Sequence, residues 1–283
     1  MIEVAPNFFN GRDDLTDISY MFYGCELLKK IPDGLFDPLV NLVDVSWLFY
    51  DCKSMEYLPT DIFSKCTHIG NVDGLFMSNT SVAVKNINSD IFSGLNEIQT
   101  AKYTFYNSSI EKIPQSLFNG KQSLVDISNC FDGCYKLTEI PSGVFDSLIN
   151  LKDVSSLFEN CSGITSIPNK LFANCKHITN ASSVFRSTGI NHIPSDIFDG
   201  LDELTNVKEA FCYTQIREVP IGLFDNKQSL ENVERCFADC LLLRRVPKGL
   251  FDDCPNINSA KEVFSYEHPF YSDYGEYLMS RKK

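Results

Sequence analysis

The chain has 283 residues, of which 43% are hydrophobic, and its formal net charge is −12. This length and hydrophobic content suit one or two globular domains with a sizeable core. The negative charge argues against nucleic-acid and anionic-membrane partners, because phosphate binding relies on Lys and Arg. It is compatible with a basic or neutral partner.

The N-terminal residues 1–6 read Met-Ile-Glu-Val-Ala-Pro. They lack the basic stretch and following apolar run of a Sec signal, and the chain shows no apolar segment of membrane-spanning length. We therefore expect no membrane insertion. The repeat described next begins at about Val4 without a separate cap, which predicts an open N-terminal end that stacks on another subunit or domain.

A hydrophobic-Pro step recurs along the chain. It occurs at Ile31-Pro32, Leu58-Pro59, Ile113-Pro114, Ile140-Pro141, Ile167-Pro168, Ile193-Pro194, Val219-Pro220 and Val246-Pro247. The steps are 26 or 27 residues apart, except where an interval of 29 residues leads to Ile87-Asn88, in which Asn replaces Pro. Self-similarity at such a period is typical of solenoids and other repeat architectures.

Phenylalanine marks two positions in each unit, and 20 of the 22 Phe fall on two ladders. The first ladder is Phe9, Phe36, Phe63, Phe92, Phe118, Phe145, Phe172, Phe198, Phe224 and Phe251. The second ladder is Phe22, Phe49, Phe76, Phe105, Phe131, Phe158, Phe185, Phe211, Phe237 and Phe264. One unit cannot bury its own apolar face, so stacked neighbours must bury it. The ladders predict a single continuous solenoid of about ten units over residues 1–264.

A polar residue stands at one fixed position in every unit; we call this set the polar column. Its members are Asp17, Asp44, Asn71, Thr100, Asp126, Asp153, Asn180, Asn206, Asn232 and Ser259. Such side chains cap helix N-termini, so we expect one or two helical turns after each, and a second short turn opened by each repeated Pro. The L-x-x-V and L-x-x-I segments predict short parallel strands. A calcium-binding ladder is the alternative, although hard cations need several converging carboxylates.

Two segments resemble a known family. The run Leu151-Lys152-Asp153-Val154-Ser155-Ser156-Leu157-Phe158-Glu159-Asn160-Cys161 is similar to the BspA-like leucine-rich-repeat proteins of bacteria, and closest to the lipoprotein-type repeat of mycoplasma surface proteins. Ile31-Pro32-Asp33-Gly34-Leu35-Phe36 also resembles the corresponding step of ordinary leucine-rich repeats. The resemblance implies a right-handed α/β solenoid of short parallel strands and one- to two-turn helices. It also implies a surface adhesin or recognition module, or a phage protein.

Eight of the 11 Cys follow a ladder Phe by three residues: Cys25, Cys52, Cys66, Cys134, Cys161, Cys175, Cys240 and Cys254. A shared repeat position favours buried thiols over disulfides. The Cys-x-His pairs at Cys66 and Cys175 lie four coils apart, too far to share a zinc ion. We find no catalytic motif and expect no cofactor, no metal and no enzymatic activity, with a cryptic Cys or metal site as the alternative.

The paired positions between L and I of the second predicted strand vary most; we call them the variable strip. They are Lys29 and Lys30, Glu56 and Tyr57, Lys85 and Asn86, Glu111 and Lys112, Thr138 and Glu139, Thr165 and Ser166, Asn191 and His192, Arg217 and Glu218, and Arg244 and Arg245. The strip is basic at both ends. Its candidate binding residues are Lys29, Lys30, Tyr57, His192, Arg217, Arg244 and Arg245. Aromatic residues and Arg dominate binding hot spots, and a solvated face of mixed charge is the alternative.

Two segments depart from the repeat. The segment from Met77 to Asn88 carries extra residues and lacks both Cys and Pro. Insertions in solenoids map to loops, often on a binding face, which makes Asn79, Ser81 and Val82 candidates; simple sequence drift is the alternative. Residues 265–283 are rich in aromatic side chains and are expected to cap the last coil or to form a docking tail.

We expect a non-catalytic recognition or adhesion module that binds a protein or glycan through the variable strip, displayed on a bacterial surface or a virion. One alternative is a structural assembly protein, such as a phage capsid or tail accessory component. Another is an intracellular protein-interaction scaffold.

Overall fold

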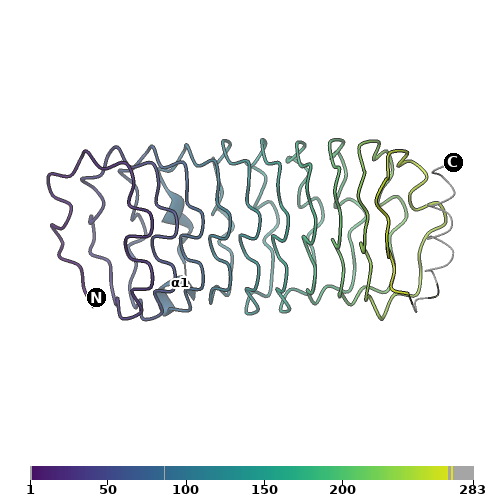
Figure 1. Cartoon of the computed structure of the whole chain (residues 1–283), viewed down its shortest axis with the longest axis horizontal. Helices are drawn as coiled ribbons and strands as arrows, with labels where there is room; N and C mark the ends of the chain where they lie inside the picture. Colours follow the sequence, from purple (N-terminus) through teal and green to yellow (C-terminus); the bar gives the residue numbers. More distant parts are fainter. Residues whose placement is uncertain (1, 86, 267–268, 270–283) are drawn as a thin grey trace.

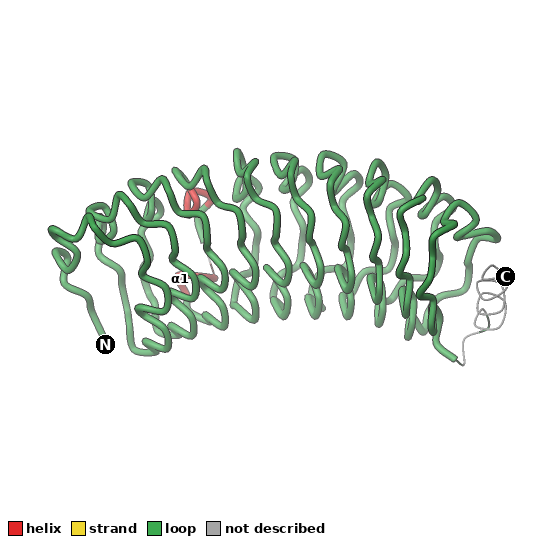
Figure 2. Tube along the Cα trace, turned by 45° about the horizontal axis from the view of Figure 1, so that its top comes forward, coloured by secondary structure: helices red, strands yellow, loops and turns green. Residues whose placement is uncertain are grey.

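The computed structural model describes residues 2–85, 87–266 and 269. The chain winds through coils that stack along one axis, with the N-terminus at one end of the stack (Figure 1). A turned view shows that the stack bends into a shallow arc (Figure 2). One hydrophobic cluster extends through the coils from Val4 to Phe264. The molecule therefore has the solenoid form that the repeat predicts.

The polar column joins each coil to the next through parallel β-bridges. The bridged pairs run from Asp17–Asp44 through Asn71, Thr100, Asp126, Asp153, Asn180, Asn206 and Asn232 to Ser259. Each coil contributes one bridged residue to this column. The predicted parallel pairing is present, as single bridges rather than extended strands.

The residues after the polar column form turns, so the prediction of helical turns there is wrong. The Asp153 carboxylate accepts the amide of Ser155 at 2.8 Å, as a capping side chain does. Ser156 and Asn160, however, have φ of 52° and 58°. A left-handed residue at every fourth position stops a right-handed helix. The amide of Ser156 instead donates to the carbonyl of Ser182 in the next coil at 2.8 Å.

The repeated Pro residues also open turns rather than helices. The amide of Leu117, for example, donates to the carbonyl of Pro114 at 3.0 Å, which is the bond that closes a β-turn. On the second predicted strand, bridges are present at Glu3–Lys30, Lys30–Tyr57 and Glu218–Arg245. Between these ends, single bonds link some of the coils there, such as that from the Glu111 amide to the Lys85 carbonyl at 3.4 Å.

The second Phe ladder is a stack of nearly parallel rings. The rings of Phe105 and Phe131 are 5.5 Å apart with planes 2° apart, and those of Phe131 and Phe158 are 5.7 Å and 7° apart. The first ladder is more tilted, with 34° between Phe118 and Phe145. Rings of both ladders are buried throughout, which confirms Phe as a core residue of each coil.

The repeated Cys are free thiols, and all but the half-buried Cys25 are buried. The S–H groups of the buried ones donate to the carbonyl of a ladder Phe in the preceding coil, as in Cys134 to Phe105 and Cys161 to Phe131, both at 3.0 Å. Burial raises the pKa of Cys134 to about 12. The predicted core thiols are thus confirmed, and each adds a hydrogen bond between coils.

The irregular third unit contains the two helices of the described chain, α1 (Val82–Lys85) and the 3-10 helix η1 (Ser89–Phe92). The extra residues therefore form short helices where their number predicts a loop. Asn79 occupies the position of a repeated Cys, and its Nδ2 donates to the carbonyl of Phe49 at 3.3 Å. Asn88 caps η1 by accepting the amide of Asp90 at 2.9 Å.

At the N-terminal end the first coil covers its own aromatic core. Phe8 packs edge-on against Phe9, with centroids 4.9 Å apart. Phe9 and Phe22 are only 2% and 1% exposed. The backbone edge of this coil is less complete, because no amide in the described chain donates to four of its carbonyls, those of Asp17, Ser19, Met21 and Tyr23. The equivalent carbonyls of the next coil accept amides of the first.

The C-terminal segment 265–283 is described only at residues 265, 266 and 269. Its role as a cap or docking tail lies outside the described residues and stays a prediction.

Candidate functional site

The variable strip follows the line of the second predicted strand from coil to coil. Its described members are exposed, except for Lys85 and Glu111, which are half-buried. Asn86 lies outside the described residues. Lys30 is bridged to Tyr57 although the two are 27 residues apart. The solenoid thus aligns side chains that are distant in sequence on one surface.

Several charges of the strip pair between adjacent coils. The pairs are Lys30–Glu3 at 3.7 Å, Lys29–Glu56 at 2.9 Å, Lys85–Glu111 at 3.0 Å and Arg245–Glu218 at 3.5 Å. Exposed pairs of this kind contribute only about 0–1 kcal/mol each. A partner could therefore displace the intramolecular carboxylates at little cost.

Tyr57 is the aromatic candidate of the strip. Its ring is half-exposed, and its hydroxyl donates to the Asp33 carboxylate at 2.8 Å. This hydrogen bond raises the pKa of Tyr57, so the hydroxyl remains a donor at neutral pH. Tyr57 therefore presents an oriented ring beside a lysine pair.

The C-terminal part of the strip carries cationic and ionisable groups that form no ion pair with any described residue. Within the described residues, no hydrogen bond or ion pair involves the side chains of His192 and Arg217, and both side chains are exposed. The Arg244 guanidinium donates to the carbonyls of Leu241 and Leu243 at 3.1 and 3.0 Å. These backbone bonds fix its direction and leave its charge without a carboxylate partner among the described residues.

Two hollows adjoin the strip. One of about 370 Å³ is lined by Lys85, Ile87, Glu111, Lys112, Ile113, Pro114 and Glu139. The other, of about 460 Å³, is lined by Asp239, Cys240, Leu241, Arg244, Ser265, Tyr266 and Pro269. The first hollow lies beside the irregular unit, and the second beside the last coils. Both are places where a partner's side chain could insert.

The three residues expected in an insertion loop do not act together. Asn79 and Ser81 are buried, and the Asn79 Oδ1 accepts the Ser81 amide at 3.1 Å. Ser81 in turn accepts the amide of Val84, inside α1, at 3.4 Å. Val82 is 63% exposed. Asn79 and Ser81 are therefore structural in this fold, and only Val82 of the three is open to a partner.

A second exposed surface, which the sequence analysis missed, follows the turns after the polar column; we call it the turn face. Its N-terminal half is aromatic and consists of Tyr20, Tyr23, Trp47, Tyr50, Tyr103 and Tyr106. Tyr23 and Tyr50 stack at 4.2 Å with planes 8° apart. Their recurrence three and six residues after the polar column was a signal in the sequence. Because these rings stack on one another, their faces are turned toward neighbouring coils.

The C-terminal half of the turn face is ionic. Arg235 lies 3.2 Å from Glu209 and 2.8 Å from Glu262. Arg186 pairs with Glu159, and its Nε lies 3.1 Å from Glu209 without the geometry of a hydrogen bond. These groups neutralise one another, so the turn face mainly links the coils.

No three His, Cys, Asp or Glu side chains of the described chain lie close enough together to hold a metal ion. The polar column instead makes hydrogen bonds between coils, as in the bond from Asn180 Nδ2 to Asp153 at 3.0 Å. The calcium-ladder alternative thus finds no cluster among these residues.

The repeat of this chain matches the model of a known repeat family. A family model described as a BspA-type leucine-rich-repeat region matches the chain in six copies, over residues 29–179 and 128–258. The chain belongs to the BspA-type leucine-rich-repeat family. The family predicted from the repeat residues is thereby confirmed.

Solved structures share the fold of this BspA-type protein. A chain of the glycosylated Toll–Spätzle complex of Drosophila is 20% identical, with a TM-score of 0.62 over 90% of this chain and 30% of that one. The ectodomain of the receptor kinase GASSHO1/SCHENGEN3 of Arabidopsis thaliana is 12% identical, with a TM-score of 0.54 over 91% and 28%. A leucine-rich-repeat protein of Leptospira interrogans is 15% identical, with a TM-score of 0.50 over 90% and 71%. The chain thus spans about a third or less of the matched chains in the Toll–Spätzle and GASSHO1/SCHENGEN3 structures.

A comparison with curated proteins found no match. Among the described residues, no helix has the length and apolar character needed to cross a membrane.

Proposed function

We propose that this BspA-type protein is a non-catalytic recognition module that binds a protein or glycan partner along the variable strip. The observation that carries the proposal is the C-terminal part of the strip. There, the side chains of Arg217 and His192 are exposed and have no partner among the described residues, and Arg244 lines a hollow of about 460 Å³. Arginine beside a pocket is a frequent hot spot of interfaces.

Two structural relatives support a binding role by analogy. The Toll–Spätzle structure and the GASSHO1/SCHENGEN3 structure with CASPARIAN STRIP INTEGRITY FACTOR 2 are both complexes. A shared fold does not transfer a partner, so the analogy supports binding as such. Display on a bacterial surface or a virion is the setting that we infer from the family resemblance.

The test uses defined ligands and two charge-matched variants. An array of glycans and a displayed peptide library would be screened with the wild-type chain. The strongest ligand would then be titrated against a variant with Arg217, Arg244 and Arg245 all replaced by Glu. The control replaces Lys65, Lys152 and Lys176 by Glu, which are exposed basic residues outside the strip. At least tenfold weaker binding by the strip variant alone supports the proposal, and equal effects of the two variants contradict it.

A second candidate, assembly through the N-terminal end, has its own support. The four carbonyls of Asp17, Ser19, Met21 and Tyr23 form an incomplete backbone edge in the first coil. Backbone edges of this kind add a further segment by hydrogen bonding. Light scattering over a range of concentrations tests it, with Met21→Glu as the blocking variant. Assembly that this variant removes supports the candidate, whereas a monomer at all concentrations contradicts it.

A further inference from the structure

Two lysines stand in a core position of the solenoid. The third residue after each first-ladder Phe from Phe36 to Phe251 is Leu39, Cys66, Leu95, Lys121, Leu148, Cys175, Leu201, Lys227 or Cys254, and in the end coil, after Phe9, it is the exposed Arg12. Leu and Cys fill this position in seven of the nine coils. Lys121 and Lys227 are only 5% and 4% exposed. A lysine in such a position packs its aliphatic stem in the core and directs its ammonium outward.

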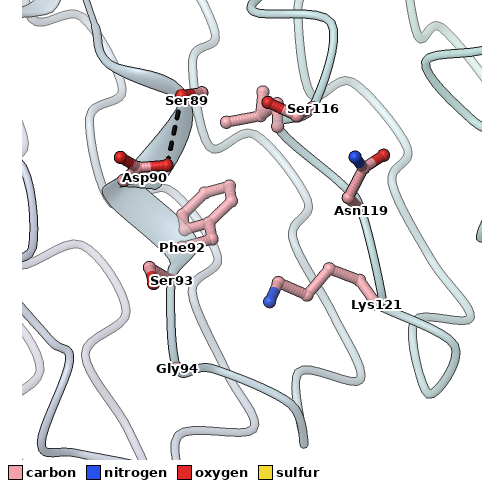
Figure 3. Close-up of a pocket in the computed structure, with 9 residues that line it drawn as sticks. Ser89, Asp90, Phe92, Ser93, Gly94, Ser116, Asn119 and Lys121 are labelled. Atoms are coloured by element: carbon pink, nitrogen blue, oxygen red, sulfur yellow. Dashed lines mark hydrogen bonds between the residues drawn. The ribbon is translucent and has the colours of Figure 1, made fainter.

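The ammonium of Lys121 lies in a pocket of about 220 Å³ between the coil of η1 and the next coil. The pocket is lined by Ser89, Asp90, Phe92, Ser93, Gly94, Ser116, Leu117, Asn119 and Lys121. In Figure 3 the Lys121 side chain extends from its coil toward the segment that carries Ser93 and Gly94. Two successive coils therefore form the walls of the pocket. Hydroxyl, amide, carboxylate and ammonium groups of the protein line it.

Ser89 donates to Asp90 at 3.2 Å at one side of this pocket, but four of its other polar side chains have no partner within the described residues. No oxygen of the described chain makes a hydrogen bond or ion pair with the Lys121 ammonium. Burial lowers the pKa of Lys121. The side chains of Ser93, Ser116 and Asn119 likewise make no hydrogen bond within the described residues. A buried cation without a direct ion pair is costly to maintain, so a ligand anion bound to Lys121 would stabilise this arrangement.

Lys227 provides an internal comparison. In the coils around it, the repeat places Asp199 where Ser93 stands and Asp225 where Asn119 stands. The local chain thus supplies negative charge around Lys227. Around Lys121 the corresponding residues are neutral, and the one carboxylate that lines the pocket, that of Asp90, makes no ion pair with Lys121. A ligand anion could therefore pair with the Lys121 ammonium.

We propose that the Lys121 pocket binds the ring of an acidic sugar, such as a uronic acid. Lys121 would pair with the sugar carboxylate, while Ser93, Ser116 and Asn119 bind ring hydroxyls. The Asp90 carboxylate would accept a hydroxyl proton, and it disfavours a doubly charged phosphate. The volume is below the roughly 300–1,000 Å³ of pockets for drug-sized ligands, which limits the occupant to a single ring. This site lies outside the variable strip and stands independently of the function proposed for it.

The test is a calorimetric titration of the full chain with methyl glucuronide, methyl glucoside, acetate and inorganic phosphate. We expect saturable binding of the glucuronide at one site, and binding at least tenfold weaker for the other three probes. Failure of the glucuronide to bind overturns the proposal. Equal binding of acetate or phosphate reassigns the pocket to an unspecific anion, and equal binding of the glucoside removes the role of Lys121. Either of these results also overturns it.

Variants locate the site. Lys121→Met keeps an apolar stem in a position that Leu and Cys otherwise occupy, and it should abolish glucuronide binding. Lys227→Met is the matched control and should bind as the wild type does. Ser93→Asp introduces the carboxylate found near Lys227, and it should also weaken glucuronide binding at least tenfold. It keeps the test decisive if Lys121→Met fails to fold. Unchanged binding by folded Ser93→Asp, or equal loss in Lys227→Met, contradicts the proposal.

Discussion

Single residues set the local geometry of the coils, and Gly74 shows how. It has a φ of +60°, and a Cβ on it would lie 2.6 Å from ring atoms of Trp47. The indole of Trp47 therefore packs directly on the backbone of the next coil and connects Tyr20 with Tyr103 on the turn face.

Any side chain at positive φ lowers the free energy of unfolding. Replacing Gly74 by Ala is expected to lower it by about 1–3 kcal/mol beyond this cost, because the added methyl group overpacks against Trp47. Gly120→Ala is the matched control, since Gly120 has a φ of +73° and no atom within 4 Å of a Cβ. Urea unfolding measures both losses. Trp47 is the only Trp of the chain, so its fluorescence should change in Gly74→Ala alone. Equal losses in the two variants would exclude the clash.

Asp132 should make stability depend on pH. It is buried beside Glu159, Arg186 and Asn160, and burial raises its pKa to about 6. A carboxyl whose pKa is higher in the folded than in the unfolded protein destabilises the fold above that folded-state pKa, and the penalty disappears as pH falls below the unfolded value near 4. Asp132→Asn should thus stabilise the protein by on the order of 2 kcal/mol at pH 8 and by little at pH 4.

The measurement is thermal unfolding of Asp132→Asn and wild type between pH 4 and pH 8. Asp202→Asn, which changes an exposed carboxylate, is the control and should show no such trend. A stability difference that does not change with pH would contradict burial of a charged Asp132.

At the scale of elements, turns replace the helices that the polar column predicts. An Asp or Asn that accepts a nearby amide begins both helices and Asx turns, so Asp153 alone could not distinguish them. The deciding feature is positive φ at Ser156 and Asn160. Neither residue is Gly, but other coils have Gly74 at the position of Ser156, and Gly24 and Gly133 at that of Asn160, which was the signal in the sequence for a left-handed backbone there. Packing between coils imposes it.

A turn and a helix at Ser156 predict opposite changes in the free energy of unfolding when this residue is replaced by Gly. Ser156→Gly should raise the free energy of unfolding by about 1 kcal/mol, because Gly adopts positive φ without steric cost. In a helix the same substitution would lower it by a similar amount. Ser162→Gly serves as the control, because Ser162 is not among the residues with positive φ, and it should be destabilising. Destabilisation by Ser156→Gly in chemical unfolding would refute the turn.

The irregular unit shows the same limit of sequence reasoning. Its extra residues were evident, but their number does not reveal that Asn79 takes the hydrogen bond of a missing Cys. Most strip residues were placed correctly on the surface, because they vary between apolar positions that the repeat keeps in the core, although Lys85 and Glu111 are half-buried. Their pairing, as in Lys29 with Glu56, depends on which coils become neighbours and on side-chain geometry that the repeat does not encode.

For the whole molecule, the single core means that each coil depends on its two neighbours. Phe158 stacks on Phe131 and Phe185 at 5.7 and 5.9 Å and is fully buried. Phe158→Ala should cost about 3–5 kcal/mol and should broaden unfolding by uncoupling the two halves. Urea titration followed by circular dichroism measures both effects.

Phe8→Ala is the control for the loss of a ring, since Phe8 is half-exposed at the N-terminal end. Its expected cost is about 1 kcal/mol or less. A small loss from Phe158→Ala, or an equally large loss from Phe8→Ala, would contradict a core that couples the coils throughout.

The most direct test of the proposed recognition role is the footprint of a bound ligand in hydrogen–deuterium exchange. The experiment would use the strongest ligand from the glycan and peptide screens at saturating concentration. We predict slower exchange in peptides of the variable strip, above all around His192, Arg217 and Arg244, with residues 19–23 and 46–50 of the turn face unchanged. Protection confined to those turn-face residues, with none on the variable strip, would contradict the account.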